Sequence, residues 1–300
     1  MTAPRDPEEL GTTTQPAHAA IADDATVGAV HLTVSDLERS IDYYRTAIGL
    51  AIREQGGGEA SLGTPDRELL HLVEQAGARP TDGYTGLYHF ALLLPERTDL
   101  ALWLAHAARD RVGMTGMSDH FVSEALYLRD PDHHGIEIYW DRPRAQWEGQ
   151  VFERMTTLPL DVDSILGELD DPASAAFDGL PGGTVMGHVH LKVANVGETI
   201  HFYRDTIGFA LMAQLGPMAA FLSAGGYHHH LGANTWESAG APPAPEGSAA
   251  LRRATILLPD EAERGRVIGR LEQAGADVAD LDGDALVRDP SGNALVLALA

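Results

Sequence analysis

The sequence contains no cysteine. This absence excludes disulfide bonds, thiolate nucleophiles, iron–sulfur clusters and cysteine-ligated zinc sites, so any metal must bind to His, Asp or Glu side chains. Fourteen histidines supply such ligands. Positive charge is also scarce, because 21 Lys and Arg residues stand against 44 Asp and Glu residues, which gives a formal net charge of -23. A surface with this charge repels nucleic acid phosphates, so no nucleic acid partner is expected.

Long hydrophobic runs are absent as well. No apolar stretch reaches the length of about 18 residues that spans a bilayer, and the first 25 residues lack a basic segment followed by an apolar one. We therefore expect a cytoplasmic protein with no membrane partner. With 300 residues, 44% of them hydrophobic, the chain is long enough for about two domains.

One segment of the chain occurs twice. Residues 34–50 (VSDLERSIDYYRTAIGL) are similar to residues 193–209 (VANVGETIHFYRDTIGF). In each copy an alternating strand leads into a helix with apolar residues at helical spacing, and Gly49 or Gly208 ends the helix. Ser35 is expected to cap the first of these helices. The chain is therefore a tandem duplication.

A second pair of related segments divides each copy further. Residues 87–95 (LYHFALLLP) are similar to residues 251–259 (LRRATILLP), and each segment leads into a predicted helix, then into strands joined by Asp-Pro turns. The pattern predicts four units of one strand, one helix and about three strands. These units begin near residues 28, 86, 187 and 250.

Three motifs within the repeats resemble a known superfamily. They are residues 86–95 (GLYHFALLLP), 118–127 (SDHFVSEALY) and 225–236 (GGYHHHLGANTW). Together with the four βαβββ units, they are similar to the vicinal oxygen chelate superfamily of glyoxalases, bleomycin resistance proteins and extradiol dioxygenases, and within it to the bacillus-type two-domain catechol 2,3-dioxygenases. The resemblance implies an α+β fold with two tandem vicinal oxygen chelate domains and mixed curved sheets.

The domain boundaries follow from the repeats and from composition. We expect a polar tail over residues 1–25, a first domain with two units over 26–141, a connection rich in Pro, Gly and Asp over 142–183, and a second domain with two units over 184–300.

The resemblance also implies where metal ligands lie, namely on the first and last strands of two paired units. The corresponding residues are Ala29 and His71 in the first unit, His89 and Glu137 in the second, His188 and His230 in the third, and Arg253 and Val296 in the fourth. Units paired in chain order would complete no ligand set. If the second unit pairs with the third, His89, Glu137 and His188 form the two-imidazole, one-carboxylate set that suits an open Fe(II) site. We expect this crossed pairing, with His230 as a further candidate ligand.

Further residues are given roles by the same resemblance. Tyr127, ten residues before Glu137, is expected to hydrogen-bond the substrate, and a histidine in the segment 227–230 is expected to act as general acid and base. Because successive strand residues point to opposite faces, either His229 or His230 faces the metal, and we favour His229. The remaining candidates are His228 and Tyr227 as substrate contacts, with His228 on the face of His230, and His120 as a proton donor.

The activity implied by the resemblance is Fe(II)-dependent extradiol cleavage of catechol or a substituted catechol, a small aromatic diol, with O2 as the co-substrate. Mn(II) accepts the same ligands. Two other classes remain. A glyoxalase-like lyase or isomerase commonly has two carboxylate ligands, and only one is expected here; a binding protein of the bleomycin resistance kind needs no ligand residues. An exposed sheet edge favours a homo-oligomer.

Overall fold

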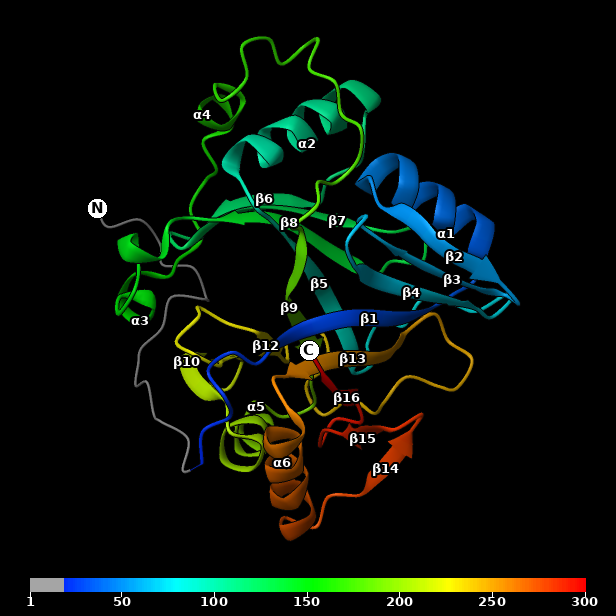
Figure 1. Cartoon of the computed structure of the whole chain (residues 1–300), viewed down its shortest axis with the longest axis vertical. Coiled ribbons are helices and arrows are strands. Elements are labelled where there is room, and N and C mark those ends of the chain that lie inside the picture. Colours follow the sequence, from blue (N-terminus) through cyan, green and yellow to red (C-terminus); the bar gives the residue numbers. More distant parts are fainter. Residues whose placement is uncertain (1–18) are drawn as a thin grey trace.

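The computed structural model describes residues 19–300 and contains four βαβββ units in the expected order (Figure 1). The first unit consists of β1 (Thr26–Val34), α1 (Leu37–Tyr43), the π-helix η1 (Tyr44–Ile48), β2 (Ala51–Gly56), β3 (Glu59–Gly63) and β4 (Glu68–Glu74). The second unit consists of β5 (Gly86–Leu94), α2 (Arg97–Asp110), β6 (Gly116–Asp119), β7 (Ser123–Arg129) and β8 (Gly135–Asp141).

The other two units follow a connection with three short helices, η2 (Arg144–Gln146), α3 (Val151–Arg154) and α4 (Val162–Leu166). The third unit consists of β9 (Val185–Lys192), α5 (Val196–Ile200), the π-helix η3 (His201–Ile207), β10 (Ala210–Leu215), β11 (Ala219–Ser223) and β12 (Leu231–Asn234). The fourth unit consists of β13 (Leu251–Leu258), α6 (Glu261–Gln273), β14 (Val278–Leu281), β15 (Asp284–Arg288) and β16 (Ala294–Leu299).

The strands form two eight-stranded mixed sheets. Sheet A has the order β10-β11-β12-β9-β5-β8-β7-β6, and sheet B has the order β14-β15-β16-β13-β1-β4-β3-β2. At the centre of each sheet two first strands pair antiparallel, β5 with β9 and β1 with β13. The second unit therefore shares a sheet with the third, and the first unit shares one with the fourth. This order confirms the crossed pairing, and the predicted α+β fold is confirmed as well.

The alternation of side chains along the central strands separates a core face from a site face. On β5, Phe90 and Leu92 are fully buried in the main hydrophobic core, to which α2 contributes Trp103. His89 and Ala91 point to the other face. The helices cover the core faces of the sheets (Figure 1), so the opposite face of sheet A is left for polar side chains.

Both repeated helices end at the expected glycines. The first of them begins one residue later than predicted. Gly49 and Gly208 adopt left-handed φ angles of 94° and 112° at the helix ends. Asp36, and not Ser35, is the N-cap of α1, and its side chain accepts a hydrogen bond from the Arg39 backbone. Ser35 instead donates its hydroxyl to Asp132, because the Asp-Pro turn of the second unit lies next to it.

The expected tail is only partly within the described chain, since residues 1–18 lie outside it. Residues 19–25 pack against the fourth unit and η3. Ile21 is buried and donates its backbone N–H to the Gly208 carbonyl at 2.9 Å, and the Ala22 N–H donates to Glu263 at 3.0 Å. Within the described chain, packed residues therefore precede the expected boundary at residue 26.

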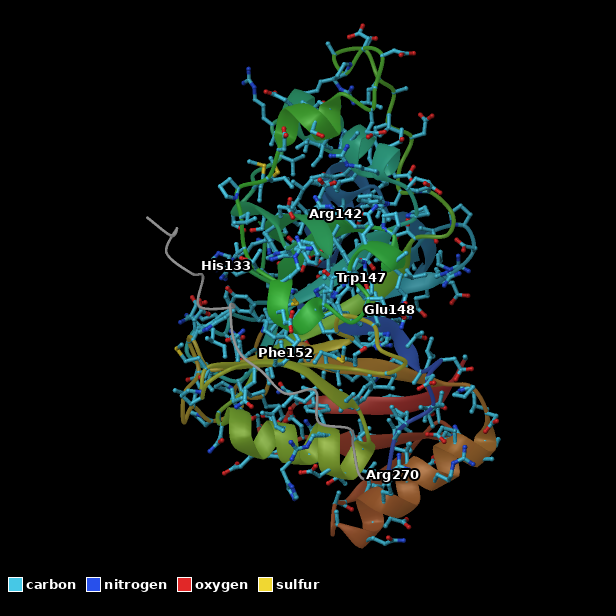
Figure 2. All side chains as sticks on the ribbon, turned by 90° about the vertical axis from the view of Figure 1, so that its left-hand side faces the viewer. His133, Arg142, Trp147, Glu148, Phe152 and Arg270 are labelled. Carbon is cyan, nitrogen blue, oxygen red and sulfur yellow. The ribbon has the colours of Figure 1, made fainter. Side chains whose placement is uncertain are left out.

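The connection between the halves is anchored to sheet A. Trp147 is 2% exposed and donates its indole N–H to the Arg142 carbonyl at 2.7 Å. Figure 2 shows Arg142, Trp147 and Phe152 along one side of the molecule, with Arg270 farther away on α6. No helix within residues 19–300 has both the length and the apolar character that a membrane crossing requires.

Candidate metal centre

Three side chains converge on the site face of sheet A because of the strand register. Glu137 on β8 and His188 on β9 both stand opposite Ala91 of β5, one on each side. His89 lies two residues before Ala91 and therefore points to the same face. The small side chain of Ala91 leaves the space between them open.

The ligand atoms of this cluster lie close together. The Nε2 atoms of His89 and His188 are 3.3 Å apart, and they lie 3.1 Å and 2.9 Å, respectively, from Oε2 of Glu137. All three residues are buried, with exposures of 7% for His89, 3% for Glu137 and 1% for His188. Within residues 19–300, they are the group of His, Asp and Glu side chains arranged to hold a metal ion.

The ionisation of the cluster suits a cation. Burial acts to raise the pKa of Glu137, but the adjacent His188 and His89 outweigh it and hold that pKa well below its ordinary value. Burial lowers the pKa of His188. A carboxylate and a neutral imidazole are the forms that bind metals. Both Nε2 atoms point at the same carboxylate oxygen. A single proton can be shared by only two of these three atoms, whereas a metal cation can accept a lone pair from all three.

Three predicted catalytic residues line the same cavity as the cluster. His229, Tyr127 and His120 border it together with the cluster's His89 and Glu137. The ring centroid of His229 lies 4.1 Å from that of His188. Apolar contributions to the wall come from Val122, Met155 and Phe221.

A chain of hydrogen bonds orients His229. His228 donates from Nε2 to Oδ1 of Asp141 at 2.9 Å, because a carboxylate can only accept. The Nδ1 of His228 then accepts from Nδ1 of His229, also at 2.9 Å. Burial, followed by the neighbouring His188 and His228, holds the pKa of His229 well below its ordinary value. The neutral His229 ring is therefore left with a free lone pair on Nε2.

Tyr127 and His120 form a second polar pair at the cavity. The carbonyl of Thr156 accepts from Nδ1 of His120 at 2.8 Å, and the Nε2 of His120 lies 2.7 Å from the Tyr127 hydroxyl, which donates to it in this tautomer. This arrangement fixes the direction of the Tyr127 O–H bond toward His120.

Comparisons with known proteins identify the superfamily of the chain. Residues 25–138 and 185–297 match the model of the Glyoxalase/Bleomycin resistance protein/Dioxygenase superfamily. The chain belongs to this superfamily. It is 38% identical over 284 residues to catechol-2,3-dioxygenase of Bacillus subtilis (strain 168), and the match covers 92% of this chain and 98% of that protein.

Two solved structures share the fold at low identity. Glyoxalase I from Zea mays aligns with a TM-score of 0.56 and 16% identity, covering 92% of each chain. The cppA protein from Streptococcus pneumoniae TIGR4 aligns with a TM-score of 0.53 and 12% identity, covering 92% of this chain and 99% of that one. Identities this low carry information on the fold alone.

Some predicted residues of this superfamily member lie elsewhere, because residues 227–230 do not form the expected strand. The strand β12 begins only at Leu231, so simple alternation does not apply to the histidines before it. His230, predicted as a further ligand, is turned away from the cluster, and its Nδ1 accepts the Ala224 N–H at 3.1 Å. His228 contacts His229 and does not share the face of His230.

Tyr227 and His71 are also separated from the cluster. Tyr227 donates its hydroxyl to Asp141 at 2.7 Å and lines a different cavity, together with His230. His71 lies in sheet B, where its ring nitrogens are each 3.1 Å from a glutamate, Glu68 and Glu59. His71 lies at one of the expected ligand positions, but it is not part of the metal-binding cluster.

Two residues near the cluster were missed by the sequence reasoning. Asp141 follows Glu137 by four positions on β8 and faces the same side, so strand spacing was the signal that could have found it. His190, two residues after His188, lines the cavity, and its Nε2 is buried without a hydrogen-bond partner in residues 19–300.

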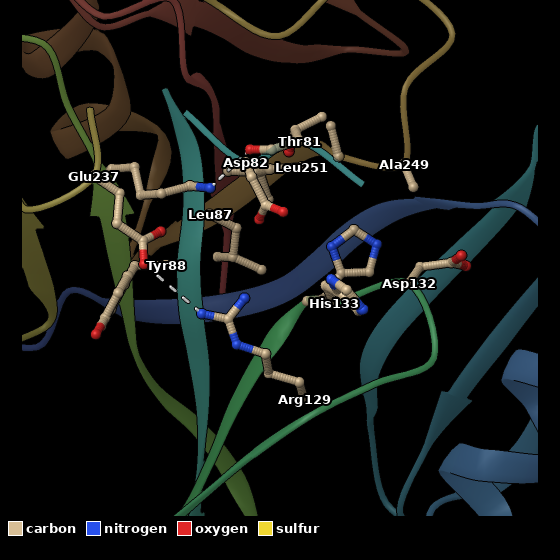
Figure 3. A pocket seen from close by; sticks show the side chains of 13 residues that line it. Thr81, Asp82, Leu87, Tyr88, Arg129, Asp132, His133, Glu237, Ala249 and Leu251 are labelled. Carbon is tan, nitrogen blue, oxygen red and sulfur yellow. Dashed lines mark hydrogen bonds and ion pairs between the residues drawn. The ribbon is translucent and has the colours of Figure 1, made fainter. Parts of the chain in front are cut away.

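A separate polar pocket lies beyond β5 (Figure 3). Its charged side chains contact one another or the backbone: Arg129 extends to within 4.0 Å of Glu237, and Lys192 donates to the Thr81 carbonyl at 3.0 Å. The side chains of Arg129 and Lys192 in this pocket already have partners. The pocket therefore does not bring together metal-ligating atoms as the cluster does.

Proposed function

We propose that the protein is an Fe(II)-dependent extradiol dioxygenase that cleaves the ring of catechol or a substituted catechol with O2. The observation that carries this proposal is the cluster of His89, Glu137 and His188, which opens on one side to a cavity lined by His229 and Tyr127. Two imidazoles and one carboxylate on one side of a cation are typical of non-haem Fe(II) oxygenases. The identity to a catechol-2,3-dioxygenase supports the same substrate class.

Ferrous iron would be held by Nε2 of His89, Nε2 of His188 and Oε2 of Glu137. When bound there, it supplies open coordination positions for the two vicinal oxygens of the diol and for O2. Mn(II) is the alternative ion for this ligand set. A glyoxalase-like reaction is less well supported, because the cluster contains one carboxylate and the second acidic ligand common in such enzymes has no counterpart in it.

His229 would manage the proton of the substrate. Its Nε2 lone pair, left free by the hydrogen bond to His228, takes a hydroxyl proton from the diol and returns it later in the reaction. Asp141 would act through His228 as a positioning residue, because it selects the tautomer of both rings.

Tyr127 would position the ring-bound oxygen of the substrate. Its hydroxyl donates to His120, so its oxygen lone pairs accept from a substrate hydroxyl on the cavity side. Val122, Met155 and Phe221 give the cavity an apolar wall that excludes water and packs against the aromatic ring.

We further propose that the protein is cytoplasmic and forms a homo-oligomer. The outer strand β2, whose six residues are all exposed, supports the homo-oligomer.

The test is reconstitution of the metal-free protein with Fe(II) under anaerobic conditions, followed by catechol and O2. A yellow ring-fission product with matched O2 consumption is the expected result. O2 consumption without the yellow product indicates a different ring cleavage. The absence of O2 consumption with every metal tried overturns the proposal. Parallel samples with Mn(II) identify the working ion.

A further inference from the structure

A second cavity borders the metal cavity, which is the space beside His89 and Glu137 described above. His89, His120 and Tyr127 line both cavities, so the two adjoin. The metal cavity has a volume of about 20 Å3, and the second one, the outer cavity, has a volume of about 330 Å3. The smaller volume holds roughly one water molecule, whereas the larger lies within the range of roughly 300–1,000 Å3 typical of small-molecule sites. Most of the room near the cluster is therefore in the outer cavity.

The largest cavity of the described chain shares no lining residue with these two. It has a volume of about 520 Å3 and lies against sheet B, with Val27, His31 and Leu69 in its wall. Within residues 19–300, none of the residues that line it also lines the metal cavity or the outer cavity. Of the two larger cavities, the outer cavity is therefore the one that can receive a part of the substrate that the metal cavity does not hold.

The walls of the outer cavity combine aromatic rings with hydroxyl groups. Tyr88 and Trp236 both line it, and their ring centroids lie 5.2 Å apart in an edge-to-face arrangement. Thr115, Ser118 and Thr157 also line it. Aromatic side chains pack favourably against a further aromatic ring. These walls therefore suit a flat apolar group.

The outer cavity shows little preference for a charged group. Arg129 lines it, but the guanidinium of Arg129 lies 4.0 Å from the carboxylate of Glu237. Within residues 19–300, no Asp or Glu residue lines this cavity. Since a carboxylate already accompanies Arg129 and no acidic group awaits a cation, an uncharged group fits these walls.

Gly116 leaves space in the outer cavity next to Tyr127. It stands directly across from Tyr127 in the antiparallel pairing of β6 with β7, so a side chain at this position would lie on the same face. A Cβ atom added to Gly116 would meet its nearest neighbour, Cδ2 of Tyr127, at 3.7 Å, which is ordinary van der Waals contact, and the φ angle of Gly116 lies outside the left-handed region. Neither crowding nor backbone conformation requires glycine here. The missing side chain instead keeps the outer cavity open.

We propose that the substrate is a catechol that carries an uncharged aromatic substituent, and that Gly116 determines this specificity. The inference rests on the proposed function and narrows its substrate class. The diol end lies at the cluster, and the substituent extends past Tyr127 into the outer cavity, where it packs against Tyr88 and Trp236. A large side chain at position 116 would fill the space that the substituent needs.

The first measurement compares cleavage of catechol, 3-phenylcatechol and 4-phenylcatechol by the Fe(II)-loaded protein. At least one phenylcatechol is expected to have a kcat/KM about tenfold or more above that of catechol, because its second ring leaves water for an apolar wall. Values for both isomers that are equal to or lower than that of catechol overturn the proposal. A higher kcat/KM for 3,4-dihydroxyphenylacetate than for both phenylcatechols also overturns it, because the cavity then selects a carboxylate.

A variant of Gly116 locates the substituent. Gly116→Phe is expected to lower the kcat/KM of the preferred phenylcatechol relative to that of catechol by at least about tenfold. This ratio cancels differences in ring reactivity and any general loss of activity. Met117→Phe is the matched control, because Met117 is the next residue of β6, points to the opposite face and is 43% exposed. An unchanged ratio in Gly116→Phe, or an equal fall in both variants, overturns the proposal.

Binding without turnover distinguishes this inference from the proposed function. Anaerobic titration calorimetry measures the affinity of the Fe(II)-loaded protein for each diol, and a thermal melt confirms that each variant is folded. If no diol is cleaved but a phenylcatechol binds at least about tenfold more tightly than catechol, the oxygenase proposal fails and the specificity of the outer cavity holds. If catechol is cleaved and the diols bind equally, the oxygenase proposal holds and this inference fails. If no diol binds, both fail. If Gly116→Phe does not fold, the comparison of diols with the parent protein decides alone.

Discussion

Sheet A and sheet B are built from the same kind of unit and have the same strand arrangement, yet their site faces differ. Sheet A brings together His89, Glu137 and His188. The repeat places Arg253, Val296 and Ala29 at the corresponding positions of sheet B, and none of these side chains binds a metal cation. The curved sheet therefore forms without a metal cluster.

This comparison separates fold from chemistry. Burying a carboxylate between two imidazoles costs free energy, because charged groups lose favourable hydration when they are removed from water. Sheet B has no such cost at the corresponding positions. Since sheet B folds the same way without it, the cluster in sheet A is not needed to form the architecture. Its retention is best explained by a role in binding.

The largest expected effect is the loss of iron binding when a cluster residue of sheet A is removed. His188→Ala is expected to lower Fe(II) affinity by at least about 100-fold, because one of three ligands is lost and a buried carboxylate is left with a single imidazole. His71→Ala, at the position in sheet B that corresponds to His230, is the control and retains iron. Iron content after desalting measures both, and equal loss in the two variants would contradict the assignment.

A large effect on catalysis without loss of iron is expected from His229. His229→Phe keeps a ring next to His188 but removes the proton acceptor, so kcat is expected to fall about 100-fold to 10,000-fold. Iron content stays unchanged. The neighbouring His230→Asn is the matched control, because the structure places His230 outside the metal cavity. A similar fall in kcat for both variants would contradict the assignment of His229, and not His230, to the metal cavity.

A smaller effect is expected from the positioning residue Asp141. Asp141→Asn leaves the size of the side chain unchanged but no longer requires His228 to donate from Nε2, so the tautomer of His229 is less well defined. We expect kcat to fall about tenfold to 100-fold with little change in KM. Steady-state kinetics at several pH values measure this. If KM rises while kcat is retained, Asp141 acts on substrate binding and not through His228.

The smallest expected effect is on stability, at the boundary between the two sheets. Burial, followed by His228 and His188, lowers the pKa of His230 to about 3. The unfolded chain binds a proton at this residue below about pH 6.5, whereas the folded chain does not until about pH 3, so stability falls as the pH falls through this window. His230 contributes a slope of up to about 1.4 kcal/mol per pH unit.

Denaturant unfolding of the parent protein and His230→Asn between pH 4 and 7 measures that contribution. The asparagine oxygen is expected to keep the hydrogen bond from the Ala224 N–H. The variant is expected to have a shallower decline in unfolding free energy toward acid pH. Identical slopes would mean that His230 is accessible to protons in the folded state.

The prediction of the fold and of the cluster depended on the internal repeat. The resemblance to the superfamily implied the strand positions at which ligands occur, and the repeat located these positions in each unit. Only one pairing of units completed a set. The sheet order confirmed that pairing.

The failures occurred where local geometry departs from a regular strand or helix. The chain before β12 turns between Tyr227 and His230, so alternation assigned His228 to the wrong neighbour and did not separate His230 from the cluster. The cap of α1 was placed one residue early at Ser35, because nothing in the sequence showed that Asp132 would occupy that hydroxyl. The first error concerns a short local turn, and the second concerns a contact between residues far apart in the chain.

The sequence by itself determined the four units, because repeats and periodicity are properties of the chain alone. The resemblance to the superfamily added the three ligand residues and, through them, the crossed pairing. The tertiary structure decided which imidazole faces which cavity, how Asp141 reaches His229 through His228, and that sheet B retains a cavity in place of a metal cluster. Such features depend on where backbone segments meet in space, and a turn of four residues is too short to have a periodicity from which that could be predicted.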